Sequence, residues 1–204
     1  THLTWNAKIS FEKKIIAATA EFKIQTSDNA SKIILDTKNL NILSIVESKT
    51  GKKLKYHLGE EKEHLGKPLV IEITPLTNVI KISYSTNTDA EALQWLAPIQ
   101  TAGKLKPFLF TQSQAILARS WIPIQDSPGI RFTYDAEVQV PKDLLALMSA
   151  ENPQEKNDTG LYFFKMNQRI PAYLMALAVG DLVFQSMGPR TGVYAEPSIL
   201  SKAV

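Results

Sequence analysis

Two glutamines separated by one residue are the side chains of this chain best suited to bind a small polar ligand. Gln112 and Gln114 flank Ser113 in the segment Thr111-Gln112-Ser113-Gln114-Ala115. A neutral amide offers its carbonyl oxygen to an ammonium group and its NH₂ group to a carbonyl. An acceptor also gains from the positive charge of an ammonium donor. The same spacing, taken alone, equally describes solvated amides at the start of a helix.

The other residue types that catalyse reactions form no recognisable constellation. The sequence has no Gly-x-Ser-x-Gly and no glycine-rich phosphate-binding motif. Its three histidines are His2, His57 and His64, and none lies near a plausible serine motif. His64 follows the charged segment Glu60-Glu61-Lys62-Glu63, but this spacing matches no zinc pattern. We therefore interpret that segment as a solvated turn.

Composition is that of a globular protein and disfavours two classes of partner. Of the 204 residues, 44% are hydrophobic and 21% are charged, as in ordinary soluble domains. The net charge is only +3, and the adjacent basic pairs are Lys13-Lys14 and Lys52-Lys53. Nucleic-acid binding requires a clustered basic footprint, so we expect no nucleic-acid partner. No apolar run approaches the roughly 18 residues of a membrane span, so we expect no membrane partner.

The absence of cysteine indicates the compartment and limits the chemistry. With no cysteine at all, the chain has neither disulfides nor thiolate metal ligands. This composition fits a reducing compartment, and we expect the protein to be cytoplasmic. No signal peptide is visible at the start. Residue 1 is Thr and not Met, which predicts a trimmed start, and a signal segment removed with it would leave no trace.

Alternation of apolar and polar residues dominates the chain and predicts an all-β fold. The clearest case is 131–140, where Phe132, Tyr134, Ala136 and Val138 share one face and charged or polar residues share the other. Such a pattern is typical of a half-buried antiparallel strand. Similar alternation covers residues 19–25, 53–58, 69–73 and 80–84. Turn-forming pairs such as Asp28-Asn29 and Thr50-Gly51 separate these strands. The expected architecture is a saddle-like antiparallel β-sandwich.

Shorter segments give weaker signals. The apolar runs 33–35 and 42–46 predict more fully buried strands, and 174–179 predicts another. Residues 112–119 lack turn formers and predict a short helix capped by the Thr111 hydroxyl. Residues 142–149 predict one further helical turn. The polar segment 151–159 is expected to be an exposed loop within one domain.

The stretch from Ala92 to Ala150 carries the most specific sequence. Its centre reads Pro107-Phe108-Leu109-Phe110-Thr111-Gln112-Ser113-Gln114-Ala115, followed by Arg119-Ser120-Trp121-Ile122-Pro123 and Gln125-Asp126-Ser127-Pro128. Supporting segments are Leu35-Asp36-Thr37-Lys38-Asn39-Leu40, Ala92-Leu93-Gln94-Trp95-Leu96, Ala136-Glu137-Val138-Gln139-Val140-Pro141-Lys142, Leu147-Met148-Ser149-Ala150 and Gly188-Pro189-Arg190-Thr191. In order and spacing they resemble the N-terminal domain of the M1 zinc aminopeptidases, most of all the branch containing leukotriene A4 hydrolase and its bacterial aminopeptidase relatives.

That resemblance implies zinc-dependent removal of N-terminal amino acids from peptides. A zinc-activated water would attack the first peptide carbonyl, with a glutamate as general base. The chain holds neither His-Glu-x-x-His nor Gly-x-Met-Glu-Asn, the motifs that carry zinc chemistry in that family. We therefore expect residues 1–204 to be a single N-terminal β domain of a larger metallopeptidase, inactive alone. Zinc would be bound by a catalytic domain outside this chain. The expected partners are peptide N-termini and that catalytic domain.

The resemblance also assigns roles around the two glutamines. In the family pattern the residue equivalent to Gln114 reaches into the catalytic cleft and binds the substrate's free α-amino group, and Gln112 lies beside it. Ala115 would border the pocket for the first substrate side chain, where a small residue leaves room. The structural alternative for Ala115 is an ordinary helix alanine.

Several nearby residues are expected to be structural. Arg119 and Asp126 are predicted to pair and to fix the loop between them. Trp95 and Trp121 suit either a ligand groove or the core, and core packing is the commoner use of buried aromatics.

The alternative to a peptidase domain is a non-enzymatic β-sandwich that serves as a binding or assembly module. Composition alone leaves both open, because a fold does not fix a function.

Overall fold

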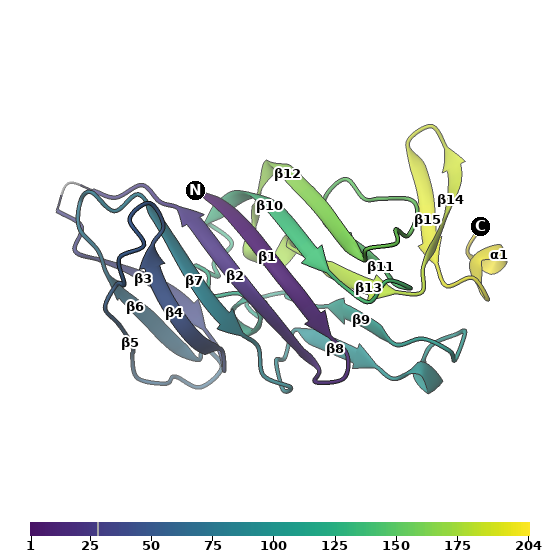
Figure 1. The fold of residues 1–204 in the computed structure, drawn as a ribbon, viewed down its shortest axis with the longest axis horizontal. Helices are drawn as coiled ribbons and strands as arrows, with labels where there is room; N and C mark the ends of the chain where they lie inside the picture. Colours follow the sequence, from purple (N-terminus) through teal and green to yellow (C-terminus); the bar gives the residue numbers. More distant parts are fainter. Residues whose placement is uncertain (28) are drawn as a thin grey trace.

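The computed structural model describes residues 1–27 and 29–204 and confirms the all-β prediction. Among these residues the strands form four sheets, and Figure 1 shows the sheets arranged along the long axis of the molecule. The only α-helix among the described residues is α1 (Leu200–Ala203), at the C-terminus. The predicted turn at Asp28-Asn29 includes Asp28, which lies outside the described residues.

A six-stranded sheet forms the centre of the molecule, with the strand order β12-β10-β1-β2-β7-β4. Its strands are β1 (His2–Ser10), β2 (Ile15–Lys23), β4 (Asn41–Glu47), β7 (Val79–Ser85), β10 (Arg131–Gln139) and β12 (Leu161–Pro171). All neighbouring pairs are antiparallel except β1 and β10, which run parallel. The predicted antiparallel sandwich therefore contains one parallel pair, formed by strands far apart in sequence.

Period-2 alternation places one face of this sheet in the core. On β10 the side chains of Phe132, Tyr134, Ala136 and Val138 are all buried, as the sequence pattern predicts. Successive residues of a strand point to opposite faces, so the intervening polar residues of β10 face outward. The other predicted inner rows on β2 and β7 are buried in the same way.

A four-stranded sheet packs against the inner face. It has the order β11-β13-β9-β8, with β8 (Leu93–Leu96), β9 (Phe108–Thr111), β11 (Leu145–Met148) and β13 (Leu177–Gly180). Tyr134 on β10 donates its hydroxyl hydrogen to the Ser149 carbonyl at 2.9 Å. Tyr162 on β12 donates to the Leu144 carbonyl at 3.0 Å. These bonds join the central sheet to the backbone on both sides of β11.

A three-stranded antiparallel sheet extends from the other end of the central sheet. It has the order β3-β6-β5, with β3 (Lys32–Thr37), β5 (Tyr56–Leu58) and β6 (Lys67–Glu72), seen at the left of Figure 1. Leu35, Leu69 and Ile71 on its inner side are buried in the common core. All three residues of β5 are exposed, and β5 is an edge strand with a partner on one side only.

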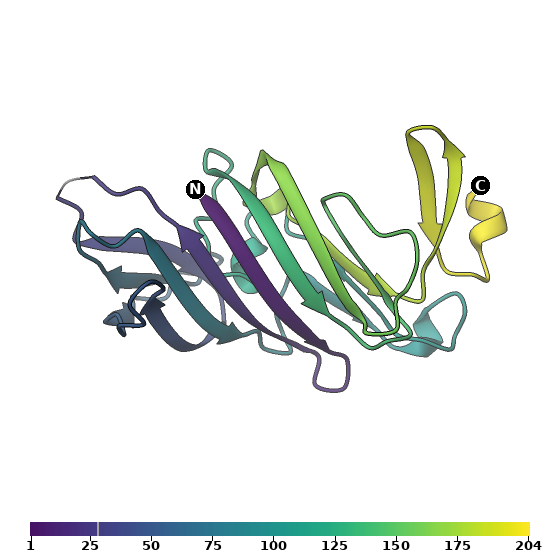
Figure 2. The same cartoon turned by 45° about the horizontal axis from the view of Figure 1, so that its top comes forward.

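The C-terminal part forms a separate hairpin. Strands β14 (Val183–Gly188) and β15 (Thr191–Ala195) pair only with each other and stand away from the central sheet (Figures 1 and 2). Glu196, directly after β15, accepts hydrogen bonds from the backbone N–H groups of Ala102 and Gly103. Phe184 and Tyr194 pack against each other across the hairpin, with ring centroids 4.8 Å apart and planes tilted by 47°.

Both predicted helical segments are wrong. Residues 112–113 have no regular structure and 114–117 form turns, followed by the short 3-10 helix η2 (Ala118–Ser120). Thr111 does not cap a helix because it ends β9, where its hydroxyl accepts a hydrogen bond from the Leu177 N–H at 2.9 Å. Residues 145–148 are strand β11 because they pair with β13. The remaining 3-10 helices are η1 (Pro98–Gln100) and η3 (Ala172–Leu174).

Two strands predicted to be more fully buried are half-exposed. On β3 the side chain of Ile34 is 43% exposed, and on β4 that of Leu43 is 61% exposed. On β3, Leu35 faces the core and its neighbour Ile34 points to the opposite, outer face. On β4, Leu43 lies at the irregularity where the register with β7 shifts between Ile42 and Ser44. The third apolar run, 174–179, contains the end of η3 and most of β13.

The turn at Gly66 yields a test of the packing between β3 and β6. Gly66 and Gly51 have nearly the same backbone angle, φ +74° and +70°. A Cβ on Gly66 would overlap the Thr37 carbonyl oxygen, whereas a Cβ on Gly51 would meet nothing within 4 Å. Gly51→Ala should cost about 1–2 kcal/mol from the left-handed backbone alone. Gly66→Ala should cost about 1–3 kcal/mol more, because the Thr37 backbone must shift.

Urea unfolding of the two variants measures this difference in the free energy of unfolding. Equal losses at the two positions would show that the Thr37 carbonyl moves away without cost.

Candidate functional site

The two predicted glutamines lie in the loop that follows β9. Gln112 and Gln114 are exposed, whereas Ser113 between them is only 3% exposed. The Gln112 N–H donates to the Ala92 carbonyl at 2.8 Å, which extends the pairing of β8 with β9 by one step. The chain is thus tied to the sheet at Gln112 and then turns Ser113 inward, leaving both amides on the surface.

The amide groups of the two glutamines differ in their partners. The Gln112 side-chain oxygen lies 3.3 Å from the Gln114 backbone nitrogen, from which it accepts a hydrogen bond. Among the described residues, no group hydrogen-bonds the carboxamide of Gln114. The Gln114 amide is therefore the one of the pair whose donors and acceptor are all available to a ligand. The peptide bond that joins Gln114 to Ala115 is cis, and Ala115 is also exposed.

A buried hydrogen-bond chain reaches this loop from the central sheet. The Trp5 indole N–H donates to the Tyr84 hydroxyl at 2.8 Å, and that hydroxyl donates to the Trp121 carbonyl at 3.0 Å. The Trp121 indole N–H in turn donates to the Ser113 hydroxyl at 3.0 Å. Burial raises the pKa of Tyr84 far above its ordinary value, so the hydroxyl keeps the proton that it donates. We call these four residues the indole chain.

A second buried cluster fixes the segment after the site. Arg119 and Asp126 pair as predicted, with Nε and Oδ2 3.2 Å apart. The Arg119 guanidinium also donates to the carbonyls of Leu65 and Asp126, at 2.9 and 3.0 Å. The Asp126 N–H donates to a carboxylate oxygen of Asp36 on β3 at 2.9 Å. Burial raises the pKa of Asp126, and the hydrogen bonds and charge of Arg119 oppose that rise.

The two tryptophans named as ligand-groove candidates have different surroundings. Trp121 is fully buried and packs edge-on against Trp5, with ring centroids 5.3 Å apart. The predicted core role of Trp121 is therefore confirmed. Trp95 is half-buried and packs edge-on against Phe11 at 5.4 Å. Its indole nitrogen is buried and has no hydrogen-bond partner among the described residues.

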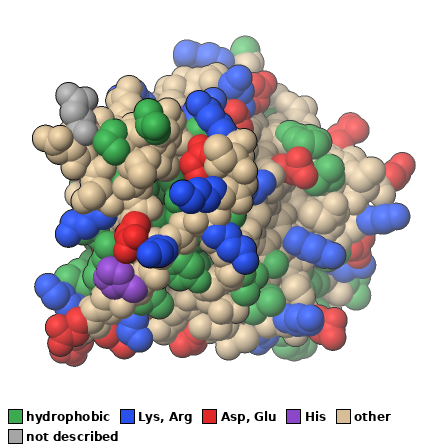
Figure 3. All heavy atoms as spheres, turned by 60° about the vertical axis from the view of Figure 1, so that its left-hand side comes forward, with side chains coloured by type: hydrophobic (Ala, Val, Ile, Leu, Met, Phe, Trp, Pro, Cys, Tyr) green, Lys and Arg blue, Asp and Glu red, His purple; other side chains and the backbone are tan. Residues whose placement is uncertain are grey.

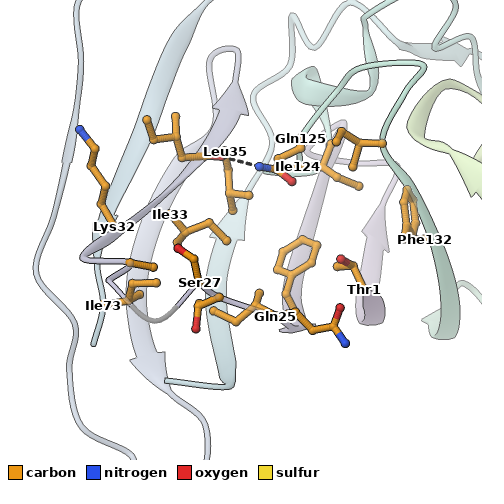
Figure 4. Close-up of a pocket in the computed structure, with 16 residues that line it drawn as sticks. Thr1, Gln25, Ser27, Lys32, Ile33, Leu35, Ile73, Ile124, Gln125 and Phe132 are labelled. Atoms are coloured by element: carbon orange, nitrogen blue, oxygen red, sulfur yellow. Dashed lines mark hydrogen bonds between the residues drawn. The ribbon is translucent and has the colours of Figure 1, made fainter. Parts of the chain in front are cut away.

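The structure also contains a cavity that the sequence did not predict, and Ile124 and Gln125, next to Asp126, line part of it. A cavity of about 380 Å³ lies between the central and three-stranded sheets, lined by Phe22, Ile33, Leu35, Ile124 and Phe132 among others (Figure 4). The Gln125 amide donates to the Ile34 carbonyl at its edge. Alternation identifies which residues face inward, but it does not reveal where two sheets diverge. Neither glutamine of the candidate site lines this cavity.

The residues of this chain do not fit a zinc ion. Across residues 1–27 and 29–204, no three His, Cys, Asp or Glu side chains group closely enough to hold a metal. The side chain of His64 is 84% exposed, and His57 is exposed as well. Figure 3 shows basic and acidic side chains interspersed over the left-hand face of Figure 1. Among the described residues, no helix is long and apolar enough to cross a bilayer.

Comparison with known families decides the class of this chain. Residues 1–174 match the Peptidase M1 N-terminal domain. The chain belongs to this family.

Relatives of this M1 domain are aminopeptidases and a hydrolase. Leukotriene A-4 hydrolase of Xenopus laevis is 38% identical over all of this chain and 35% of its own length. Leucine aminopeptidase 2 of Yarrowia lipolytica is 37% identical over 99% of this chain and 31% of its own length. Human aminopeptidase B is 50% identical over 53% of this chain and 17% of its own length. The chain thus spans about a third of the first two relatives.

A solved structure has the same fold. Yeast LTA4 hydrolase in complex with bestatin superposes with a TM-score of 0.89 at 33% identity, over 99% of this M1 domain and 32% of that chain.

The Arg119–Asp126 pair gives a stability test of this M1 domain. Asp126→Asn keeps the size of the side chain and removes its charge, leaving the buried guanidinium with only the more distant Asp36 carboxylate, at 3.6 Å, as counter-ion. Breaking one side of a buried pair costs about 3–5 kcal/mol. The matched control is Asp143→Asn, since Asp143 pairs with Lys106 and its side chain is 51% exposed. Exposed pairs contribute about 0–1 kcal/mol.

Denaturant unfolding of both variants measures the two losses. If Asp126→Asn cost no more than Asp143→Asn, the pair would not hold the segment in place.

Proposed function

We propose that this chain forms one wall of the substrate cleft of a zinc-dependent aminopeptidase and recognises the free amino terminus of peptides. The observation that carries this proposal is the Gln114 carboxamide, exposed and without a protein hydrogen-bond partner among the described residues, beside a buried and anchored Ser113. A free amide held at a fixed position on a peptidase domain suits a ligand that carries an ammonium group.

The chemistry of an amide fits this task. An exopeptidase must distinguish a free amino terminus from a blocked one. The Gln114 carbonyl oxygen would accept a hydrogen bond from the substrate ammonium, and its NH₂ group would donate to a peptide carbonyl. A hydrogen bond to a charged group contributes about 1.5–3 kcal/mol. A blocked terminus lacks that charge and gains less.

Gln112 and Ala115 would complete the subsite. The Gln112 oxygen accepts from the Gln114 backbone, so its NH₂ group is the part that faces outward to a ligand. Ala115 projects little from the surface, and this leaves room for the first side chain of the substrate. In this proposal the chain binds and orients the substrate but transfers no proton.

The bond-breaking step would belong to another part of the protein. The described residues offer no set of zinc ligands, so we propose that metal and base lie on a catalytic domain against which this domain packs. A cytoplasmic location is part of the same proposal, since all 204 residues include no cysteine.

The first prediction from this proposal concerns Gln114 in the full-length enzyme. Gln114→Ala should leave folding and zinc content unchanged, because an exposed amide supports no core. It should lower kcat/KM for alanyl- and arginyl-arylamides about ten- to a hundred-fold, the equivalent of one hydrogen bond to a charged group. Gln114→Glu should keep binding, since a carboxylate also accepts from an ammonium.

Steady-state kinetics on these arylamides tests the assignment. The matched control is Gln168→Ala, which removes another exposed amide from β12 and should leave kcat/KM unchanged. Wild-type kcat/KM in Gln114→Ala would reduce Gln114 to a surface loop residue.

The second prediction concerns the 204-residue chain by itself. It should fold, and it should not hydrolyse aminoacyl-arylamides even with zinc supplied. Zinc should also leave the thermal unfolding midpoint unchanged, because the described residues offer no set of zinc ligands. If zinc did bind the native state, a concentration of 100 times Kd would stabilise the fold by about 2.7 kcal/mol. Turnover that persists through purification and is abolished by a point substitution in this chain would contradict the proposal that the bond is broken on another domain.

A further inference from the structure

We propose that Ser113 is a positioning residue: its buried hydrogen bond to Trp121 holds the Gln112–Gln114 loop in the geometry needed to bind a substrate ammonium. This inference rests on the proposed function, since it explains how a loop without regular structure keeps an exposed amide in place. Ser113 would touch no substrate itself.

The loop has few other restraints near the glutamines. Residues 112–117 belong to no strand or helix. The Gln112 N–H is tied to the Ala92 carbonyl, and the Leu117 N–H donates to the Ser113 carbonyl at 2.9 Å. From Gln112 to Ala115, only the Ser113 side chain is buried. Its hydroxyl is therefore the point at which this surface segment is attached to the interior.

The partner of Ser113 is itself rigidly held. The Trp121 ring is fully buried against Trp5, and the Trp121 carbonyl accepts from Tyr84. Trp5 lies on β1 and Tyr84 lies on β7, both in the six-stranded sheet. The indole chain therefore ties Ser113 to the central sheet through Tyr84, which lies 29 residues earlier in the sequence, and through Trp5, which lies still earlier.

A second hydroxyl closes the other end of the loop. Ser120 donates to the Leu117 carbonyl at 2.7 Å and accepts from the Ala92 N–H at 3.1 Å. Ala92 thus contacts both ends, through Gln112 and through Ser120. With both ends closed on Ala92, the Ser113–Trp121 bond is the contact that ties the middle of the loop to a buried side chain.

The expected fall in kcat/KM depends on how far the Gln114 amide moves when the Ser113 hydrogen bond is lost. A misplacement of about 1 Å can cost on the order of a hundredfold in rate. Removing the Ser113 hydroxyl also leaves the Trp121 N–H buried without an acceptor, which favours movement of the loop. Loss of this one bond should therefore be felt at Gln114, which is the next residue.

A double-substitution cycle in the full-length enzyme tests the inference. Ser113→Ala removes the acceptor, Trp121→Phe removes the donor and keeps an aromatic ring, and the third variant combines them. Each single variant should lower kcat/KM for alanyl-arylamides about tenfold or more. The double variant should lower it by little more than the worse single one, since both break the same interaction.

The matched control is Tyr162→Phe, which removes a buried hydroxyl bonded to the Leu144 carbonyl. It should lower stability and leave kcat/KM unchanged. A reduced kcat/KM in Tyr162→Phe equal to that of Ser113→Ala would assign the effect to general destabilisation and overturn the positioning role.

An NMR measurement on the 204-residue chain gives a readout that does not depend on activity. The chain has three tryptophans, so the Trp121 indole N–H can be assigned among three signals. Ser113→Ala should shift that signal and also the side-chain amide signals of Gln112 and Gln114, whereas Tyr162→Phe should shift none of them. Unmoved glutamine amides would overturn the inference.

The outcomes separate this inference from the proposed function. If Gln114→Ala leaves kcat/KM at the wild-type value, the proposed function fails. If Gln114→Ala lowers it but neither Ser113→Ala nor Trp121→Phe does, the proposed function stands and the positioning role fails. If Ser113→Ala does not fold, Trp121→Phe alone decides by the same two readouts.

Discussion

The buried ion pair of Arg119 with Asp126 is the interaction on which the functional side of this domain depends. The segment between them crosses the interior, yet it has only one short 3-10 helix and a single bridge to β3. Buried polar groups must find hydrogen-bond partners. Here the guanidinium donates to Asp126 and to the Leu65 carbonyl, and the Asp36 carboxylate accepts from the Asp126 N–H. The pair thereby ties the three-stranded sheet to the segment 119–126, which follows the two glutamines.

The candidate site is attached to the rest of the fold from two directions. The Arg119 cluster holds the segment to the three-stranded sheet, and the indole chain holds it to the six-stranded sheet through Trp121. Between these attachments the chain emerges at Gln112 and Gln114 and presents their amides outward. Rigid sheets with a short exposed loop between them are a common way to place a binding group. Here the loop is held at its middle as well as at its ends.

Membership of the M1 family gives these contacts a functional setting. The chain spans about a third of the leukotriene A-4 hydrolase and leucine aminopeptidase 2 that it matches. No group of metal-binding side chains occurs in the part of the chain that the structure describes. The proposed division of labour follows from these two facts: this domain would recognise the end of the peptide, and the reaction would take place on residues of another domain. Neither Gln112 nor Gln114 lines the cavity of Figure 4, so the cavity has no part in this proposal.

The sequence by itself determined the fold class, the inner faces of the long strands and the pairing of Arg119 with Asp126. Alternation suffices for a strand such as β10, because one of its faces packs against the core and the other faces outward. It failed for residues 112–119 and 145–148, whose strand and turn conformations depend on partners in β8 and β13. It also failed for Ile34 and Leu43, since a short apolar run does not reveal that one face of β3 is open to solvent or that the pairing of β4 with β7 shifts at Leu43. Only the tertiary structure brought Trp121 onto Ser113, because the position of the indole is set by packing against Trp5 and Tyr84, far away in the chain.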